Sequence, residues 1–209
     1  IYSASKAAAE IFISSFFRSF LSSKENLTLA VGRAGNVIGG GDWAKDRVVV
    51  DCMEAWDKNE VVKIRNPEST RPWQHVLEPL SGYLHLTNLI YESRELNGEA
   101  FNFGPNPKDI MSVKSLIEAL SKKFKIENPY EISRSSNFPE SSLLQLDISK
   151  ARKLLNWQPV LHTKEMIASV SDWYFNFFNG NEDLLEFSSK QIEIYESKAS
   201  KRKLSWTKH

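Results

Sequence analysis

The 209-residue chain is 41% hydrophobic and 25% charged, a composition typical of folded globular proteins, which excludes a disordered or collagen-like chain. Its 27 lysines and arginines nearly balance its 26 aspartates and glutamates, so no long-range field favours nucleic acid or an anionic membrane, and we expect a small ligand held by a few placed residues. One cysteine and four histidines exclude an internal disulfide and a thiolate zinc site; they predict no metal and indicate a reducing, cytoplasmic compartment. Every apolar run is far shorter than the ~20 residues that span a bilayer.

Helical and strand patterns alternate along the chain. Helices are predicted over residues 2–22, 46–58, 78–92, 112–124, 147–155 and 163–180, with Ser112, Asp147 and Thr163 as N-caps and Gly180 at the last C-terminus. Strands are predicted over residues 27–32, 61–65, 71–76, 100–104 and 130–133, and a glycine-rich loop over residues 35–41 follows the first strand. Strands that alternate with helices predict an α/β fold, and the basic residues from 198 onward predict a frayed tail.

The first chemical signal is Tyr2-Ser3-Ala4-Ser5-Lys6. Positions i and i+4 share one face of a helix, so Tyr2 and Lys6 lie side by side. A nearby cation favours the charged form of a phenol, whose pKa is ordinarily near ~10, and turns it into a usable proton acceptor. The pattern is weak, and taken alone it is better explained as a surface tyrosine one turn from a lysine.

A second signal directly follows the first predicted strand. The segment from Arg33 to Trp43 contains Asn36 and the glycines at 35, 39, 40 and 41. Ligands of open α/β sheets bind beyond the carboxyl ends of the strands, and glycines let the backbone approach a phosphate closely. The alternative is a plain loop in which Arg33 forms a salt bridge.

Three arginines supply the third signal. Arg65 ends a predicted strand, Arg71 begins the extended segment 71–76, and Arg47 lies at the start of a predicted helix. Guanidinium forks bind phosphate in a bidentate way, so the three could neutralise a diphosphate in a chain without excess charge. Each arginine taken singly is better explained as a surface residue, and His75 is better explained as a hydrogen-bonded structural histidine than as a catalyst.

In combination, these segments resemble the extended short-chain dehydrogenase/reductase superfamily of nucleotide-sugar epimerases and dehydratases. The generic features are Tyr-Ser-x-Ser-Lys-x-x-x-Glu from Tyr2, Arg33 with Asn36, and Asn102 in Phe-Asn-Phe-Gly-Pro. Within the superfamily, Gly-Gly-Gly-Asp-Trp (residues 39–43) and Arg-Pro-Trp-Gln-His-Val-Leu-Glu-Pro (residues 71–79) resemble the CDP-glucose 4,6-dehydratases most. The resemblance extends from residue 1 to about residue 196.

The resemblance implies the C-terminal part of a Rossmann-type doubly wound parallel sheet plus a small α/β domain that binds the sugar nucleotide. Residues 1–60, interleaved with 71–104, would belong to the NAD-binding domain; residues 61–70 and 105–196 would form the substrate-binding domain, and residues 197–209 a flexible basic tail. Family members carry a Gly-x-x-Gly-x-x-Gly fingerprint and acid/base carboxylates upstream of the Tyr/Lys helix, and neither precedes Tyr2 here. We therefore expect the chain, which begins at Ile1, to be part of a longer enzyme and to be inactive by itself.

For the intact enzyme, the resemblance implies conversion of CDP-D-glucose to CDP-4-keto-6-deoxy-D-glucose, with loss of water and internal hydride transfer through NAD. Tyr2 would accept the proton of the 4-hydroxyl, while Lys6 would lower the phenol pKa and contact the nicotinamide ribose. The cofactor-binding residues would be Tyr2, Lys6, Arg33 and Ala34, and the substrate-binding residues Asn36, Arg47, Arg65, Arg71 and Asn102. The role of Glu140 is left open.

The resemblance also implies a homodimer that pairs through the helix over residues 2–22, whose phenylalanines are spread too widely for one intramolecular face to cover. Two other functions remain open. Another epimerase, decarboxylase or dehydratase of the superfamily would use the same Tyr/Lys pair, and a non-enzymatic remnant or pairing module is the second alternative.

Overall fold

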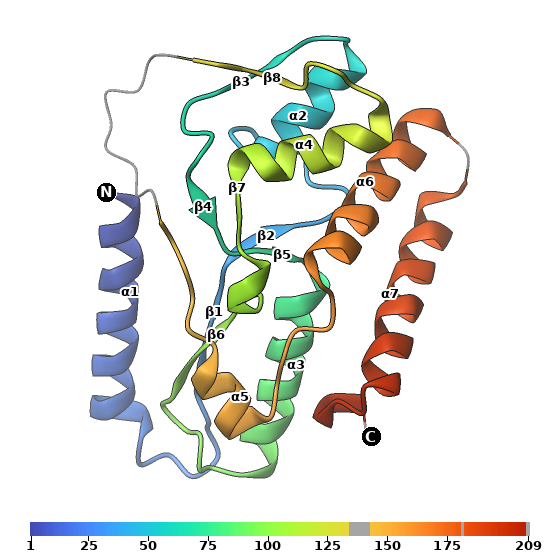
Figure 1. Cartoon of the computed structure of the whole chain (residues 1–209). Helices are drawn as coiled ribbons and strands as arrows, with labels where there is room; N and C mark the ends of the chain where they lie inside the picture. The colour runs from blue at the N-terminus through green and yellow to red at the C-terminus, as the bar shows by residue number, and fades with distance from the viewer. Residues whose placement is uncertain (134–142, 181, 208–209) are drawn as a thin grey trace.

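The structure is a computed structural model that describes residues 1–133, 143–180 and 182–207 (Figure 1). Its helices are α1 (Tyr2–Phe16), continued by a π-helical turn over Phe17–Leu21, α2 (Val48–Asp57), α3 (Leu77–Glu92), α4 (Val113–Phe124), α5 (Ser149–Leu155), α6 (Thr163–Asn179) and α7 (Leu184–Lys201). Its strands are β1 (Val31–Ala34), β2 (Asn36–Ile38), β3 (Val62–Ile64), β4 (Thr70–Arg71), β5 (Trp73–His75), β6 (Ala100–Phe103), β7 (Met111–Ser112) and β8 (Tyr130–Ile132).

Most strands pair in parallel. β1 pairs with β6, β2 with β5 and β3 with β8 in parallel, whereas β4 and β7 are antiparallel. Helices lie between the paired strands in sequence, as parallel pairing requires, because a parallel connection must cross back over the pair. The predicted α/β class is therefore confirmed. Within the part of the chain that the structure covers, no helix is long and apolar enough to cross a membrane.

The first strand differs from its predicted bounds. It starts at Val31, whose N–H donates to the Glu99 carbonyl at 2.9 Å, and runs to Ala34 in register with Phe103. The residues predicted to begin it are held by side chains instead: Arg94 donates to the Leu27 carbonyl at 3.0 Å, and the Leu29 N–H donates to the Asn97 side chain. Three of the seven residues of the predicted glycine-rich loop form strand β2.

Two of the three predicted N-caps are each displaced by one residue. Ser112 caps α4 as predicted, since its hydroxyl accepts from the Ser115 N–H at 3.1 Å. Asp147 accepts from the Ser149 N–H at 2.8 Å, but lies one residue before the cap of α5. His162 precedes α6 and Thr163 is its first residue, because the Thr163 hydroxyl is bonded to Asp109 instead. Gly180 ends α6 at φ 62°, as predicted.

The expectation of a flexible tail from residue 197 is wrong as far as residue 207. Helix α7 continues to Lys201, and its N-cap Asp183 accepts from two backbone N–H groups at 3.0 Å. Leu204 is 3% exposed, and the Trp206 ring stacks on Tyr195 with centroids 5.8 Å apart. Apolar side chains among the basic residues thus hold the tail to the body as far as residue 207.

The chain forms two main hydrophobic cores. The predicted domain bounds stay a prediction. In the upper part of Figure 1, helix α2 packs with β3, α4 and α6 around Met53, Leu116 and Val170. In the lower part, α5 packs with α3 and β6 around Phe101, Phe103 and Trp157. Residues 48–57 therefore share a core with the expected substrate-binding domain, and residues 148–157 share one with the expected NAD-binding domain.

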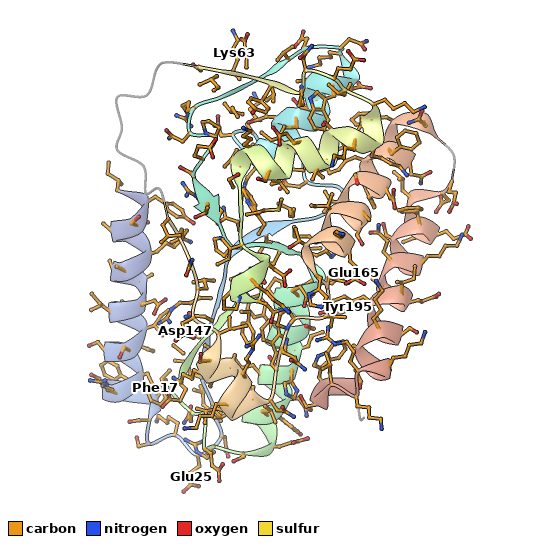
Figure 2. All side chains as sticks on the ribbon, viewed as in Figure 1. Phe17, Glu25, Lys63, Asp147, Glu165 and Tyr195 are labelled. Carbon is orange, nitrogen blue, oxygen red and sulfur yellow. The ribbon has the colours of Figure 1, made fainter. Side chains whose placement is uncertain are left out.

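A buried polar network joins α3 to α7 and to the segment before α6. Glu78 on α3 is 2% exposed and accepts from the Val160 and Leu161 N–H groups and from the Tyr195 hydroxyl at 2.9 Å. Ser81 contacts the same hydroxyl at 2.9 Å. Figure 2 shows Tyr195 among the side chains between these elements. Burial raises the pKa of Glu78 to about 7, although the donors around it favour the ionised form.

Glu78 should make the stability of the fold depend on pH. Because its folded pKa of about 7 exceeds the ordinary value of 4.5, the folded state holds the proton more tightly. The free energy of unfolding should therefore fall as pH rises from 4.5 to 7, by up to about 3 kcal/mol, and level off above. Urea unfolding at several pH values tests this. In the Glu78→Gln variant, the decrease in the free energy of unfolding between pH 4.5 and 7 should be absent. Tyr195→Phe removes a donor to the Glu78 carboxylate, so in this variant the decrease in the free energy of unfolding should extend to higher pH. If the free energy of unfolding depended on pH in the same way in all three proteins, Glu78 would not be its cause.

Candidate functional site

Tyr2 and Lys6 lie together on an open face of α1. The Lys6 ammonium is 5.5 Å from the centroid of the Tyr2 ring, and both side chains are exposed. Helix α1 runs in the opposite direction to β1, so the end that bears Tyr2 lies toward the carboxyl ends of β1 and β6 (Figure 1). Open α/β sheets bind their ligands at that end.

Arg33 and Asn102, predicted at the cofactor and the substrate, bond to each other and to neighbouring segments. The Arg33 guanidinium donates to both carboxylate oxygens of Glu10 on α1 and, at 3.1 Å, to the Asn102 side chain. Asn102 donates in turn to the Asp147 carbonyl at 3.0 Å. The hydrogen bonds from Arg33 hold the pKa of Glu10 below its usual range. The salt bridge considered for Arg33 is thus present, and Ala34 ends the same strand opposite Phe103.

The other four predicted substrate residues converge on one cavity. Asn36 at the start of β2, Arg47 before α2, Arg65 after β3 and Arg71 on β4 all line a space of about 310 Å³. This is near the lower end of the ~300–1,000 Å³ typical of small-molecule sites. Asn102 does not line it. The sequence separates these arginines by up to 24 positions, and only the fold brings them together.

The cavity offers free positive charge. Arg47 and Arg65 are exposed and, within the described residues, pair with no carboxylate. Arg71 is only 9% exposed, and its guanidinium donates to the Thr70 carbonyl at 2.8 Å, so it is held in place. Lys63, which also lines the cavity, has its ammonium 3.5 Å from Glu131.

Three aspartates share the cavity lining with these cations: Asp42, Asp46 and Asp51. Burial first, and then the charges of Asp46 and Glu54, raise the pKa of Asp51. Within the described residues, no three His, Cys, Asp or Glu side chains are grouped as a metal site would need. The arrangement therefore suits an anion that arginine forks hold.

The glycine run at residues 39–41 packs against protein, which the sequence interpretation missed. A Cβ on Gly40 would collide with the Trp173 ring of α6, and one on Gly39 with Val76. Trp43 continues the contact: its ring centroid is 5.4 Å from that of Tyr174, whose hydroxyl donates to the Asp42 carbonyl at 2.8 Å. The glycines thus let the loop lie flat on α6, instead of opening it to a phosphate.

His75 is structural, as its sequence context favoured. It is 3% exposed, its Nδ1 accepts from the Leu77 N–H at 3.3 Å, and burial lowers its pKa to about 4. The neighbouring Gln74 donates to the Phe103 carbonyl at 2.8 Å. Glu140, whose role was left open, lies outside the described residues.

Sequence comparison supplies one strong similarity. The chain is 38% identical over 200 residues to the CDP-glucose 4,6-dehydratase of Salmonella typhimurium, an alignment that covers 94% of this chain and 55% of that enzyme. The chain thus spans about half the length of this curated relative. The resemblance inferred from the motifs is confirmed. No model of a protein family matches the chain.

Solved structures agree on the fold. The UDP-glucuronic acid 4-epimerase of Bacillus cereus, in complex with UDP-glucuronic acid and NAD, matches with a TM-score of 0.71 at 18% identity, over 84% of this chain and 52% of that one. The dTDP-glucose 4,6-dehydratase of Bacillus anthracis, in complex with NAD, matches with a TM-score of 0.67 at 15% identity, over 84% and 52%. The predicted Rossmann-type architecture is therefore confirmed.

Gly40→Ala should lower stability, because the added methyl group meets the Trp173 ring. We expect a loss of about 1–3 kcal/mol in the free energy of unfolding, measured by urea denaturation. In a Trp173→Leu background, where the ring is gone, the same substitution should cost clearly less. Equal stability of Gly40→Ala and wild type would show that the glycine is not required by this packing.

Proposed function

We propose that this chain is the part of a CDP-glucose 4,6-dehydratase that carries the substrate-binding domain and the end of the NAD-binding domain; the enzyme is an NAD-dependent lyase that converts CDP-D-glucose to CDP-4-keto-6-deoxy-D-glucose. The observation that carries the proposal is the cavity at which Asn36, Arg47, Arg65 and Arg71 converge. The similarity over 94% of the chain to an enzyme of that name supports the same reaction. The reaction is proposed for the complete enzyme.

The arginine cavity suits the diphosphate of the sugar nucleotide. Arg47 and Arg65 have no carboxylate partner in the described part, and Arg71 is fixed by its bond to the Thr70 carbonyl. A guanidinium fork matches two phosphate oxygens, and one that is already ordered loses less entropy on binding. Asn36 adds a neutral donor at the end nearest β1.

Parts of the dinucleotide site are present in this chain. The exposed Tyr2 and Lys6 and the end of β1 at Ala34 lie at the edge where open sheets hold a dinucleotide, so these residues fit NAD. Arg33 does not, because Glu10 occupies its fork. When bound, NAD supplies an acceptor and donor of hydride, so that the dehydration needs no external oxidant.

Tyr2 is assigned as the base at the sugar 4-hydroxyl. Its phenol oxygen would take the hydroxyl proton as the carbonyl forms, with the Lys6 ammonium 5.5 Å from the centroid of its ring. A 4-keto group acidifies the hydrogen on C5, which permits loss of water across C5 and C6. The arginines would hold the diphosphate meanwhile, so the sugar keeps its place through oxidation at C4, loss of water across C5 and C6, and return of the hydride to C6, which leaves no net oxidation.

The cellular compartment in which the protein works belongs to the same proposal. Cys52 is buried and not part of a disulfide, as is common for proteins of a reducing compartment. A nucleotide-sugar dehydratase made from this chain would therefore work in the cytoplasm.

Loss of one cavity arginine should weaken binding of CDP-glucose. In a chimera that places this chain after the part of the Salmonella enzyme that it does not cover, Arg65→Gln or Arg47→Gln should cost about 1.5–3 kcal/mol of affinity in calorimetry. Lys58→Gln, which removes the same charge from an exposed position outside the cavity, is the matched control and should bind normally. Unchanged affinity of both arginine variants would remove the diphosphate assignment.

Tyr2→Phe should abolish product formation and leave CDP-glucose affinity nearly intact. The phenol oxygen acts on the charge that develops at O4, whereas affinity comes from the distant arginine cavity. The 4-keto-6-deoxy product is followed by its alkaline absorbance in the same chimera. Turnover of the Phe variant within tenfold of the parent would exclude Tyr2 as the base, and no product from the parent chimera would contradict the proposed reaction itself.

A homodimer through α1 is the proposed assembly. No residue of α1 is buried in the chain alone. Its Phe12 and Phe16, and Phe20 in the π-helical turn that continues it, are 67%, 43% and 61% exposed, with successive ring centroids 5.9 and 5.1 Å apart. Such a continuous aromatic stripe favours burial against a second copy. Light scattering of the 209-residue chain at high micromolar concentration should give the dimer mass, and Phe16→Glu should give the monomer. A strictly monomeric wild type contradicts this assembly.

A further inference from the structure

One polar contact between side chains joins helix α1 to the rest of the described chain. No residue of α1 is buried; Glu10 and Ile13 are half-buried, and Phe17, in the π-helical turn that continues the helix, packs on Gly98. Within residues 1–133, 143–180 and 182–207, the only side-chain hydrogen bonds that leave the helix join Glu10 to Arg33. The position of α1 therefore depends strongly on this pair.

The geometry of the Glu10–Arg33 pair fixes the relative orientation of the two side chains as well as the distance between them. Arg33 donates through two nitrogens to the two oxygens of Glu10, and a fork-to-fork contact fixes the plane of both groups. A third nitrogen of Arg33 donates to Asn102, its register partner on β6, at 3.1 Å. Asn102 then donates to the carbonyl of Asp147, which is labelled in Figure 2, so the contact extends from α1 across two strands to the segment before α5.

Glu10 lies on the same face of α1 as the proposed catalytic pair. Tyr2, Lys6 and Glu10 are spaced by four residues, which places them in one row along the helix. At 1.5 Å per residue, Glu10 is about 12 Å along the axis from Tyr2. Fixing the rotation at Glu10 therefore fixes the direction in which Tyr2 and Lys6 point.

We propose that Glu10, acting through Arg33, is a positioning residue that turns Tyr2 and Lys6 toward the carboxyl ends of β1 and β6. The inference rests on the proposed function, and it assigns to Arg33 a role inside the protein in place of contact with the cofactor. A helix rotates by 100° per residue, so a small loss of register at Glu10 moves the phenol oxygen away from its target. Misplacement of a reacting group by about 1 Å can cost about a hundredfold in rate.

The first test measures α1 in the 209-residue chain by amide hydrogen exchange at constant chain concentration. Glu10→Gln should speed exchange of the α1 amides at least tenfold and leave those of α4 and α6 unchanged. Asp172→Asn is the matched control: it breaks the Lys123–Asp172 pair, whose side chains are 42% and 43% exposed, close to the 41% and 34% of Arg33 and Glu10. The Glu10→Gln/Arg33→Gln double variant should be no faster than the faster single one, because the two residues act together. Unchanged α1 exchange in Glu10→Gln overturns the proposal.

The second test uses the chimera and separates positioning from simple loss of stability. Glu10→Gln should lower kcat about tenfold or more and keep the KM for CDP-glucose within twofold. Glu10→Gln should also increase the kinetic isotope effect on kcat that is measured with sugar deuterated at C4, because cleavage of the C4–H bond becomes slower than the other steps. A smaller amount of folded enzyme would lower kcat without changing the isotope effect, so an unchanged isotope effect overturns the proposal. A parent chimera that forms no product contradicts the proposed function, while exchange in α1 still decides whether Glu10 holds the helix.

Discussion

A change of strand partner at Gly35 determines where the functional side chains lie. The Gly35 N–H donates to the Phe103 carbonyl at 3.2 Å, and the next N–H, of Asn36, donates to the Pro72 carbonyl at 3.0 Å. The chain thus leaves β6 and joins β5 within one residue. A Cβ at Gly35 would collide with the same Pro72 carbonyl, so this close approach needs glycine. Gln74, which also donates to the Phe103 carbonyl, holds the two pairs together from the buried side.

Because of this change of partner, two residues only three positions apart, Arg33 and Asn36, lie in different parts of the site. Arg33 comes before it, on the strand that faces α1, and its fork is filled by Glu10. Asn36 comes after it and lines the arginine cavity. The two belong to one sequence motif, and the motif alone does not say that they serve different parts of the site. Their separation places Tyr2 and Lys6 on one side of the junction and the proposed diphosphate contacts on the other.

The sequence predicted what depends on local periodicity and missed what depends on distant pairing. Helices over 46–58, 78–92 and 112–124 lie within two residues of their observed bounds, because apolar spacing and caps are local signals. The first strand was misplaced because its register is chosen by β6, about 70 residues later. The helix from Leu184 was missed although Asp183 offered a cap, since its exposed face is largely polar and few of its residues are buried.

For the site, the sequence predicted the residue types and the set of Asn36, Arg47, Arg65 and Arg71 that lines one cavity, but not the contact between Glu10 and Arg33. Arginine chemistry indicated a diphosphate, but the meeting of Arg47, Arg65 and Arg71 at one cavity is a product of the fold. Glu10 was visible as the last residue of the Tyr-Ser-x-Ser-Lys-x-x-x-Glu pattern, and its role needed the position of Arg33. Spacing identified the row on the helix, and tertiary structure identified its partner.

Packing of the glycine loop explains how the cavity can exist before a ligand arrives. Gly40 lies against Trp173, and the Tyr174 hydroxyl holds the Asp42 carbonyl, so α6 fixes the path of the chain from β2 toward α2. Arg47 immediately precedes α2, and its backbone is therefore placed by aromatic contacts that involve no substrate. A preformed cation site loses less entropy when it binds a diphosphate than one assembled by the ligand. The glycines would thus contribute to the proposed phosphate binding indirectly, by allowing α6 to position the segment that carries Arg47.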